Sequence, residues 1–195
     1  MNAASPDMVD LESVIITAAL GRRQFRAPDL YRENLAIIRL ADEMARSPGD
    51  ILQHVSETVL QICHAQSAGI SLLEKAGNAF YWPAIAGALK PLVGGGTPRD
   101  FGPCGTVLDR NAIILFSHPE RHFDYLAQVS PCIEEGLLAP FRIGGKAVGT
   151  VWAITHDPGR QFDTEDARAL DSLSKFASSA YRTLAEIGAI KRSWN

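Results

Sequence analysis

Features that mark several specialised classes of protein are scarce in this sequence of 195 residues. It holds three cysteines, an odd count without framework spacing, which fits reduced thiols better than a disulfide scaffold. No apolar run approaches the roughly 20 residues that span a bilayer, and the N-terminus lacks the basic and apolar regions of a signal peptide. The net charge of −3 gives no general attraction to nucleic acid or to an anionic membrane. We therefore expect a cytoplasmic protein that binds neither.

The sequence also lacks complete motifs for common phosphate, metal and catalytic sites. The glycines of Gly94-Gly95-Gly96 are not followed by the lysine of a P-loop, so we expect a flexible loop there. Cys104, His118, His122 and Cys132 have the composition of a zinc site, but their spacing matches no zinc finger or ribbon. We therefore expect no bound metal. No catalytic triad can be argued from spacing, because triads are assembled in space.

Signals for both strands and helices are present, which is typical of an α+β fold, and they are clearest over residues 136–187. Two apolar runs, 137–143 and 146–155, flank Gly144-Gly145, a pair that suits a two-residue hairpin. Asp163 then begins a helix and forms a capping-box pair with Asp166. Apolar residues of this helix recur at steps of three and four, at Leu170, Leu173, Ala177, Ala180, Leu184 and Ile187.

The chain ahead of residue 136 carries weaker signals. Apolar periodicity and capping residues predict helices at about 10–20, 30–46, 50–65 and 103–109. Strands are predicted at 68–73, 79–85 and 112–116. Regular signals are thin between 87 and 135, and a long irregular segment in a compact domain is usually functional or mobile. The polar residues 1–8 are expected to be disordered.

The segment that runs from Gly149-Thr150-Val151-Trp152 through His156-Asp157 to Phe162-Asp163-x-Glu165-Asp166 resembles GAF domains that accompany bacterial sensor histidine kinases. GAF domains are small-ligand and light-sensing modules. The resemblance covers roughly residues 30–187, about one domain. It implies a central antiparallel sheet of about six strands, with helices on one face and pocket-closing loops on the other. Residues 1–29 would be a partly disordered extension with one short helix, and 188–195 a tail.

The resemblance also implies that residues 94–135 close a ligand pocket. Aromatic side chains in and near this region suit a flat ligand, although core packing is the simpler explanation for each of them. Arginine and histidine side chains there suit a carboxylate or phosphate, or are solvated loop charges. The predicted ligand-binding residues are Trp82, Arg99, Phe101, Cys104, Arg121, His122, Tyr125 and Trp152.

Two ligand types known for GAF domains match this sequence only in part. His122-x-x-Tyr125-Leu126 resembles the motif of cyanobacteriochrome-type domains, but Arg121 stands where those domains attach a bilin through cysteine. A thioether cannot form there, which leaves a non-covalent tetrapyrrole or another flat ligand, with Cys132 as a distant alternative thiol. Phe162 and Asp166 match part of the cyclic-nucleotide motif of phosphodiesterase GAF domains, whose Asn-Lys pair is replaced by Thr155-His156. The sequence therefore identifies no cofactor.

One enzymatic alternative follows from the same resemblance. Free methionine-(R)-sulfoxide reductases are GAF-fold enzymes with cysteines in this loop region, and Cys104 and Cys132 lie in broadly similar places. One thiolate would attack the sulfoxide and a second would resolve the product as a disulfide. Against this alternative, the strand over 151–155 lacks the acidic residues of that family.

The function that we expect is a non-catalytic small-molecule sensor. Ligand binding would order residues 94–135 and shift the terminal helices, which must interact differently in the two states. The apolar seam of the last helix favours a homodimer, formed from Ala180 onward because the inner part must cover the sheet. A histidine kinase or another signalling protein would be the partner. The remaining alternative is a ligand-free dimerisation module whose pocket is filled by its own side chains.

Overall fold

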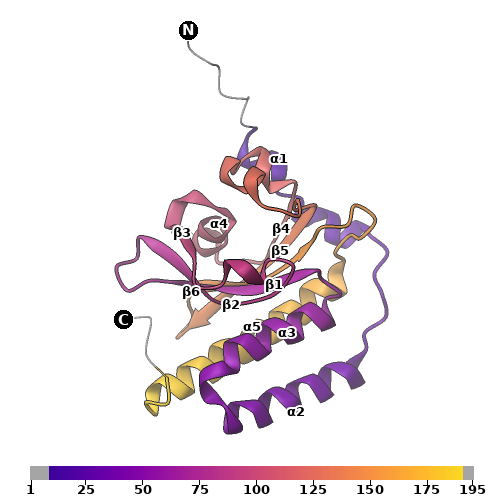
Figure 1. The fold of residues 1–195 in the computed structure, drawn as a ribbon. Helices are drawn as coiled ribbons and strands as arrows, with labels where there is room; N and C mark the ends of the chain where they lie inside the picture. Colours follow the sequence, from indigo (N-terminus) through magenta and orange to yellow (C-terminus); the bar gives the residue numbers. More distant parts are fainter. Residues whose placement is uncertain (1–8, 191–195) are drawn as a thin grey trace.

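The computed structural model of the protein describes residues 9–190 and is built on a six-stranded antiparallel sheet (Figure 1). Neighbouring strands follow the order β3-β2-β1-β6-β5-β4. Their bounds are β1 Ser67–Leu73, β2 Ala79–Gly87, β3 Gly96–Pro98, β4 Ile114–Ser117, β5 Glu135–Ile143 and β6 Lys146–Thr155. The expected antiparallel sheet of about six strands is confirmed. The disorder expected for residues 1–8 falls outside the described residues.

Strands β5 and β6 form a hairpin, and its second strand, β6, lies in the middle of the sheet beside β1. Gly144 and Gly145 connect the strands with φ values of 58° and 84°, which only glycine adopts without strain. β6 pairs with β1 on one side and β5 on the other, and its residues from Gly149 to Thr155 are buried. The predicted two-residue turn and the predicted central strand are therefore confirmed.

The main helices cover one face of the sheet (Figure 1). They are α2 Leu30–Arg46, α3 Ile51–Ile62, which follows the short 3-10 turn Pro48–Asp50, and α5 Thr164–Glu186. α5 and α3 lie directly on the sheet, and α2 lies outside α3. α5 begins with a complete capping box between Asp163 and Asp166, as predicted.

The apolar seam of α5 packs inside this domain. Leu170, Ala177, Ala180 and Leu184 are each at most 5 % exposed and belong to the core cluster on this face. Only Ile187, at 70 % exposure, points outward. The expectation that the helix from Ala180 onward is free for a partner is therefore wrong, because Ala180, Tyr181 and Leu184 are buried in the core that α5 forms with the sheet, α2 and α3.

The N-terminal segment differs from the single helix expected over residues 10–20. It forms a four-residue helix, α1 Leu11–Val14, and a separate 3-10 turn, Thr17–Arg22. Between them Ile15 adopts extended backbone and bridges Phe116 of β4. Pairing with the exposed edge of the sheet thus replaces the helix that the apolar periodicity alone predicts.

The glycine cluster also differs from the flexible loop that we expected. Gly96 begins the edge strand β3, and Gly94 and Gly95 exchange backbone hydrogen bonds with Trp82 at 2.9 and 2.8 Å. A Cβ at Gly96 would lie 2.1 Å from the Phe80 carbonyl oxygen, so the close pairing requires glycine there.

The second face of the sheet carries α4 Pro103–Arg110 and several 3-10 turns. The turns are Lys90–Leu92, Arg99–Phe101, Pro119–Arg121 and Asp124–Gln128. Together with α1 they enclose a second apolar cluster that contains Val14, Phe116 and Trp152. Across residues 9–190, no helix has the length and apolar character needed to cross a membrane.

Candidate functional site

A cavity of about 100 Å³ lies on this second face, between the sheet and the segments that cross it. Its wall consists entirely of uncharged residues, most of them apolar. The lining residues are Ser71, Trp82, Ile85, Leu89, Leu92, Thr97, Gly102, Pro103, Cys104, Phe116, Pro119, Tyr125, Leu126, Val129, Ile133, Gly136, Leu138, Trp152 and Ile154. Ten of these fall within residues 94–135, the segment that the sequence predicted to close a pocket.

The floor of the cavity is set by the register of three central strands. Trp152 of β6 lies between Gly69 of β1 and Leu138 of β5. A Cβ at Gly69 would approach the Trp152 ring to 2.4 Å, so the indole lies flat across β1 only because this residue is glycine. The strand alternation therefore places Trp152 and Leu138 toward the cavity.

A chain of polar side chains crosses this apolar floor. Thr150 and Ser71 are direct cross-strand partners, and Cys104 of α4 lies over both. The Thr150 hydroxyl donates to Cys104 Sγ at 3.2 Å, Cys104 Sγ donates to Ser71 Oγ at 3.5 Å, and Trp152 Nε1 donates to Ser71 Oγ at 3.1 Å. Burial raises the pKa of the Cys104 thiol, so the sulfur stays protonated at neutral pH.

Tyr125 also lines the cavity, close to the start of α4. Its ring stacks on Phe101 with a centroid distance of 5.0 Å. Burial raises the pKa of its hydroxyl, which therefore remains a neutral hydrogen-bonding group. Within the described chain this hydroxyl makes no hydrogen bond to protein. It is an available polar group beside an apolar cavity.

The structure brings four of the eight predicted ligand-binding residues to the cavity: Trp82, Cys104, Tyr125 and Trp152. Phe101 lies behind Tyr125 and is 47 % exposed.

The three predicted anion-binding residues lie elsewhere. Arg99 pairs with Asp100 and Asp109. Arg121 is exposed, and His122 Nδ1 contacts the carbonyl oxygen of Val9 at 2.7 Å. Because none of these side chains lines the cavity, they form no carboxylate or phosphate site there.

Two polar residues of the floor, Ser71 and Thr150, were missed by sequence reasoning. Both are polar residues at alternating positions of otherwise apolar strands, which is the one signal in the sequence that sets them apart. Which face of the sheet carries a cavity is decided by the packing of α4 and the 3-10 turns, and no strand pattern contains that information.

The cysteines and histidines considered for zinc do not converge. Cys104 lines the cavity while Cys132 is exposed, and residues 9–190 contain no group of three or more His, Cys, Asp or Glu side chains suited to a metal ion.

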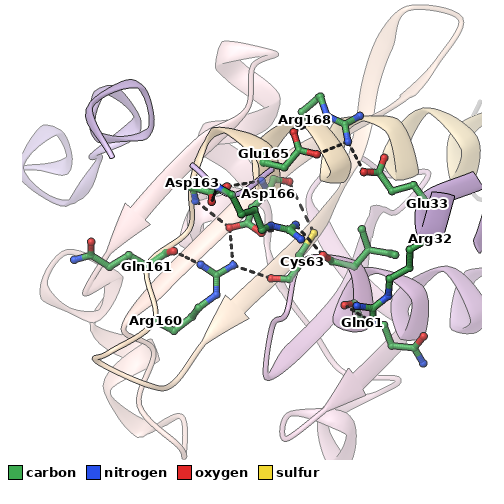
Figure 2. Close-up of polar contacts among 12 residues, drawn as sticks. Arg32, Glu33, Gln61, Cys63, Arg160, Gln161, Asp163, Glu165, Asp166 and Arg168 are labelled. Carbon is green, nitrogen blue, oxygen red and sulfur yellow. Dashed lines mark hydrogen bonds and ion pairs between the residues drawn. The ribbon is translucent and has the colours of Figure 1, made fainter. Parts of the chain in front are cut away.

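The acidic residues at the start of α5 form a separate polar cluster on the other face (Figure 2). Asp166 is fully buried and pairs with Arg26 at 2.9 Å and Arg160 at 2.6 Å. Arg160 also donates to the carbonyl oxygen of Cys63 at 3.0 Å. Phe162, the other residue of the partial cyclic-nucleotide motif, is fully buried. Both motif residues thus serve the core and the helix cap.

The comparisons with known proteins agree with this architecture. A family model described as GAF domain matches residues 45–181. Among solved structures, the GAF domain of an Acinetobacter phosphoenolpyruvate-protein phosphotransferase is 19 % identical, with a TM-score of 0.69 over 85 % of this chain and 100 % of its own.

Two further solved structures have the same fold. Free methionine-R-sulfoxide reductase from Neisseria meningitidis, in complex with its substrate, is 21 % identical (TM-score 0.67, covering 84 % of this chain and 97 % of its own). The GAF-B domain of DevS from Mycobacterium smegmatis is 15 % identical (TM-score 0.60, covering 72 % and 97 %). Among curated proteins, none matches this sequence. Because the family model spans well over half of the residues and solved GAF domains share the fold, the chain belongs to the GAF domain family.

Proposed function

We propose that this protein is a non-catalytic sensor domain that binds a small, uncharged and largely apolar organic molecule. The observation that carries the proposal is the cavity itself, which is lined by uncharged side chains and lies under the segment 94–135. Concave apolar sites with a few polar groups are the usual form of small-molecule sites in proteins. A charged ligand would lose its hydration there without gaining a partner of opposite charge.

The size of the cavity limits the ligand further. A cavity of roughly 150 Å³ holds benzene in another protein, and drug-sized ligands take about 300–1,000 Å³. At about 100 Å³ the present cavity suits a single ring or a short aliphatic chain. A tetrapyrrole or a cyclic nucleotide requires the covering segments to move apart first.

A route from the cavity to the helices supports the sensor proposal. Residues 9–26, which we call the N-terminal strap, run along β4 and then down one side of the domain to α2 (Figure 1). At its upper end Val14 packs in the cluster of the cavity wall. At its lower end Arg23 pairs with Glu135 at 2.6 Å, and Arg26 pairs with Asp166 of α5.

The strap therefore contacts both the ligand side and the helix side. Phe116 lines the cavity and pairs with Ile15 of the strap. A shift of Phe116 would therefore displace the strap, which leads to the start of α2. Ligand binding in the cavity and contacts at the helices could then both favour the same conformation of the strap. Allosteric coupling requires such a shared two-state element.

We also propose a homodimer, with α2 as its main surface, and a histidine kinase or other signalling protein as the downstream partner. α2 is the outermost helix, and its exposed face carries Tyr31 at 76 % and Ile38 at 57 % exposure. Large apolar side chains that gather on one exposed face favour a protein contact. The three unpaired cysteines are consistent with a cytoplasmic location.

The second candidate function is thiol-dependent sulfoxide reduction. The observation in its favour is that Cys104 faces the cavity in a fold shared with a free methionine-R-sulfoxide reductase. The uncharged wall opposes it, because a free amino acid carries both an ammonium and a carboxylate group. Turnover of free methionine sulfoxide that disappears in Cys104→Ser and Cys132→Ser would establish the enzyme and refute the sensor.

The test of the sensor proposal is native mass spectrometry of freshly purified protein, followed by titration with benzene under NMR detection. We expect either a co-purified small molecule or saturable benzene binding that perturbs the cavity residues. Gly136→Val serves as the blocked variant, because Gly136 lines the cavity and a Cβ there meets only ordinary contacts. Gly21→Val, in open surroundings, is its control. Absence of both signals, or binding unaffected by Gly136→Val, would refute the proposal.

A further inference from the structure

The polar chain on the cavity floor holds more hydrogen-bond donors than it can pair. Its members carry four donor protons: the Trp152 indole N–H, the Ser71 and Thr150 hydroxyl protons and the Cys104 thiol proton. Three contacts join these groups, Trp152 to Ser71, Cys104 to Ser71 and Thr150 to Cys104. Within the described chain, no other acceptor takes a proton from these four side chains, and the only further contact is the Cys104 backbone N–H, which donates to its own Sγ. One proton is therefore left over, however the hydroxyl and thiol groups rotate.

The packing decides where this surplus proton lies. Thr150 is fully buried and does not line the cavity, so an unpaired hydroxyl proton there would have no possible acceptor. An unpaired buried donor is more costly than one that faces an open site. Ser71 and Cys104 both line the cavity. The surplus proton is thus held by one of these two side chains and is directed at the space where a ligand would sit.

We propose that the natural ligand is a single-ring or similarly small apolar molecule that carries one neutral hydrogen-bond acceptor, such as a carbonyl oxygen, bound at Ser71 and Cys104. This inference rests on the proposed sensor function and names the chemical class of its ligand. The apolar wall favours an apolar ring or chain, and the surplus donor orients the ligand by binding its acceptor atom at the floor of the cavity. The hydroxyl of Tyr125, which also lines the cavity, offers a second neutral contact.

Two probes of equal shape test this inference, namely benzonitrile and phenylacetylene. Both place a linear two-atom group on a benzene ring, but only the nitrile nitrogen is a good acceptor. Without a donor in the cavity, the nitrile would lose its hydrogen bond to water on binding, and phenylacetylene would bind about tenfold tighter. With the surplus donor, benzonitrile binds at least as tightly, and its C≡N stretching frequency in the complex lies at the hydrogen-bonded position.

The Tyr125→Phe variant separates the floor from the wall. If Ser71 and Cys104 supply the donor, the shifted C≡N band persists in this variant. A shift that is present in the parent protein and lost in Tyr125→Phe would overturn the assignment to the floor. Tight binding of phenylacetylene, with an unshifted nitrile band, would overturn the acceptor requirement but leave the apolar sensor intact. Failure of both probes and of benzene to bind would overturn the proposed function as well.

Discussion

Gly102 and Tyr125 approach each other closely in the wall of the cavity. Gly102 is the N-cap of α4 and has extended backbone that any residue can adopt. A Cβ added there would lie 2.4 Å from the Tyr125 hydroxyl oxygen, which is far inside van der Waals contact. We expect Gly102→Ala to displace Tyr125 and to lower the free energy of unfolding by about 1–3 kcal/mol, measured by urea denaturation.

Two comparisons isolate this contact as the cause. Tyr125→Phe removes the oxygen and leaves the nearest ring carbon at 3.3 Å, so the double variant should recover part of the loss. Gly49→Ala, which meets no atom within 4 Å, should change stability by less than about 1 kcal/mol. Strictly additive effects of the two wall substitutions would show that the loss has another origin.

The three cysteines should differ in reactivity because they differ in burial. Cys132 is exposed, Cys104 lines the cavity and Cys63 is fully buried. Burial raises the pKa of Cys104 and of Cys63, and Asp166 adds to the effect at Cys63. Since the thiolate is the reactive form, iodoacetamide at pH 8 should label Cys132 first, Cys104 more slowly and Cys63 only after unfolding.

Mass spectrometry of peptides taken during the labelling reaction measures this order. Raising the pH should speed labelling at Cys104, because a larger fraction of its thiol is then ionised. Labelling of Cys104 ahead of Cys132 would contradict the structure and would favour a reactive, catalytic thiol at the cavity.

Among the elements, the N-terminal strap is the one whose anchoring can be tested most directly. Arg23 makes a two-pronged contact with Glu135 at 2.6 and 3.0 Å and donates to the Phe162 carbonyl oxygen at 2.6 Å. Arg23 and Glu135 side chains are only 15 % and 7 % exposed. Removing one partner of a buried pair leaves the other charge uncompensated, so Arg23→Ala should destabilise the domain by about 3–5 kcal/mol in urea denaturation.

The neighbouring residue offers a matched control. Arg22 is exposed and forms no ion pair within residues 9–190, so Arg22→Ala should be nearly neutral. Arg23→Met combined with Glu135→Gln removes both charges and should restore part of the stability lost in Arg23→Ala. A double variant as unstable as the single one would mean that the Phe162 contact, and not the uncompensated carboxylate, anchors the strap.

Local chemistry explains which elements the sequence predicts well. α2 begins and ends where expected, because Asp29 accepts from the Arg32 N–H and Pro48 follows its last turn. The α5 cap and the Gly144-Gly145 turn are likewise encoded by neighbours in sequence. The strap and β3 were missed because partners far along the chain, Phe116 and Phe80, decide their backbone.

The candidate site was predictable to the extent that the family fold was recognised. Two aromatic residues on strands, Trp82 and Trp152, line the cavity, and so do several residues of the segment 94–135. The charged residues do not, because Arg99 finds Asp109 ten positions away and His122 meets the N-terminal strap. These contacts form only in the folded chain and hold both side chains outside the cavity. A single sequence does not reveal them.

On the scale of the whole molecule, the outer helix decides whether two copies associate. The seam of α5 is used by the core, whereas Tyr31 and Ile38 lie seven residues apart on one exposed face of α2. We expect the protein to be a dimer at micromolar concentration, measured by size-exclusion chromatography with light scattering. Tyr31→Lys combined with Ile38→Lys should convert it to a monomer, because a lysine ammonium is costly to bury in an interface.

The control for this experiment lies on the opposite side of the sheet. Val93, in the covering segments and 47 % exposed, is a similar apolar side chain away from α2, so Val93→Lys should leave the dimer intact. Dissociation by both substitutions would point to a general effect of added positive charge. A parent protein that elutes with the mass of one subunit would refute the dimer, and signal transfer would then have to pass through the strap and α2 to a different protein.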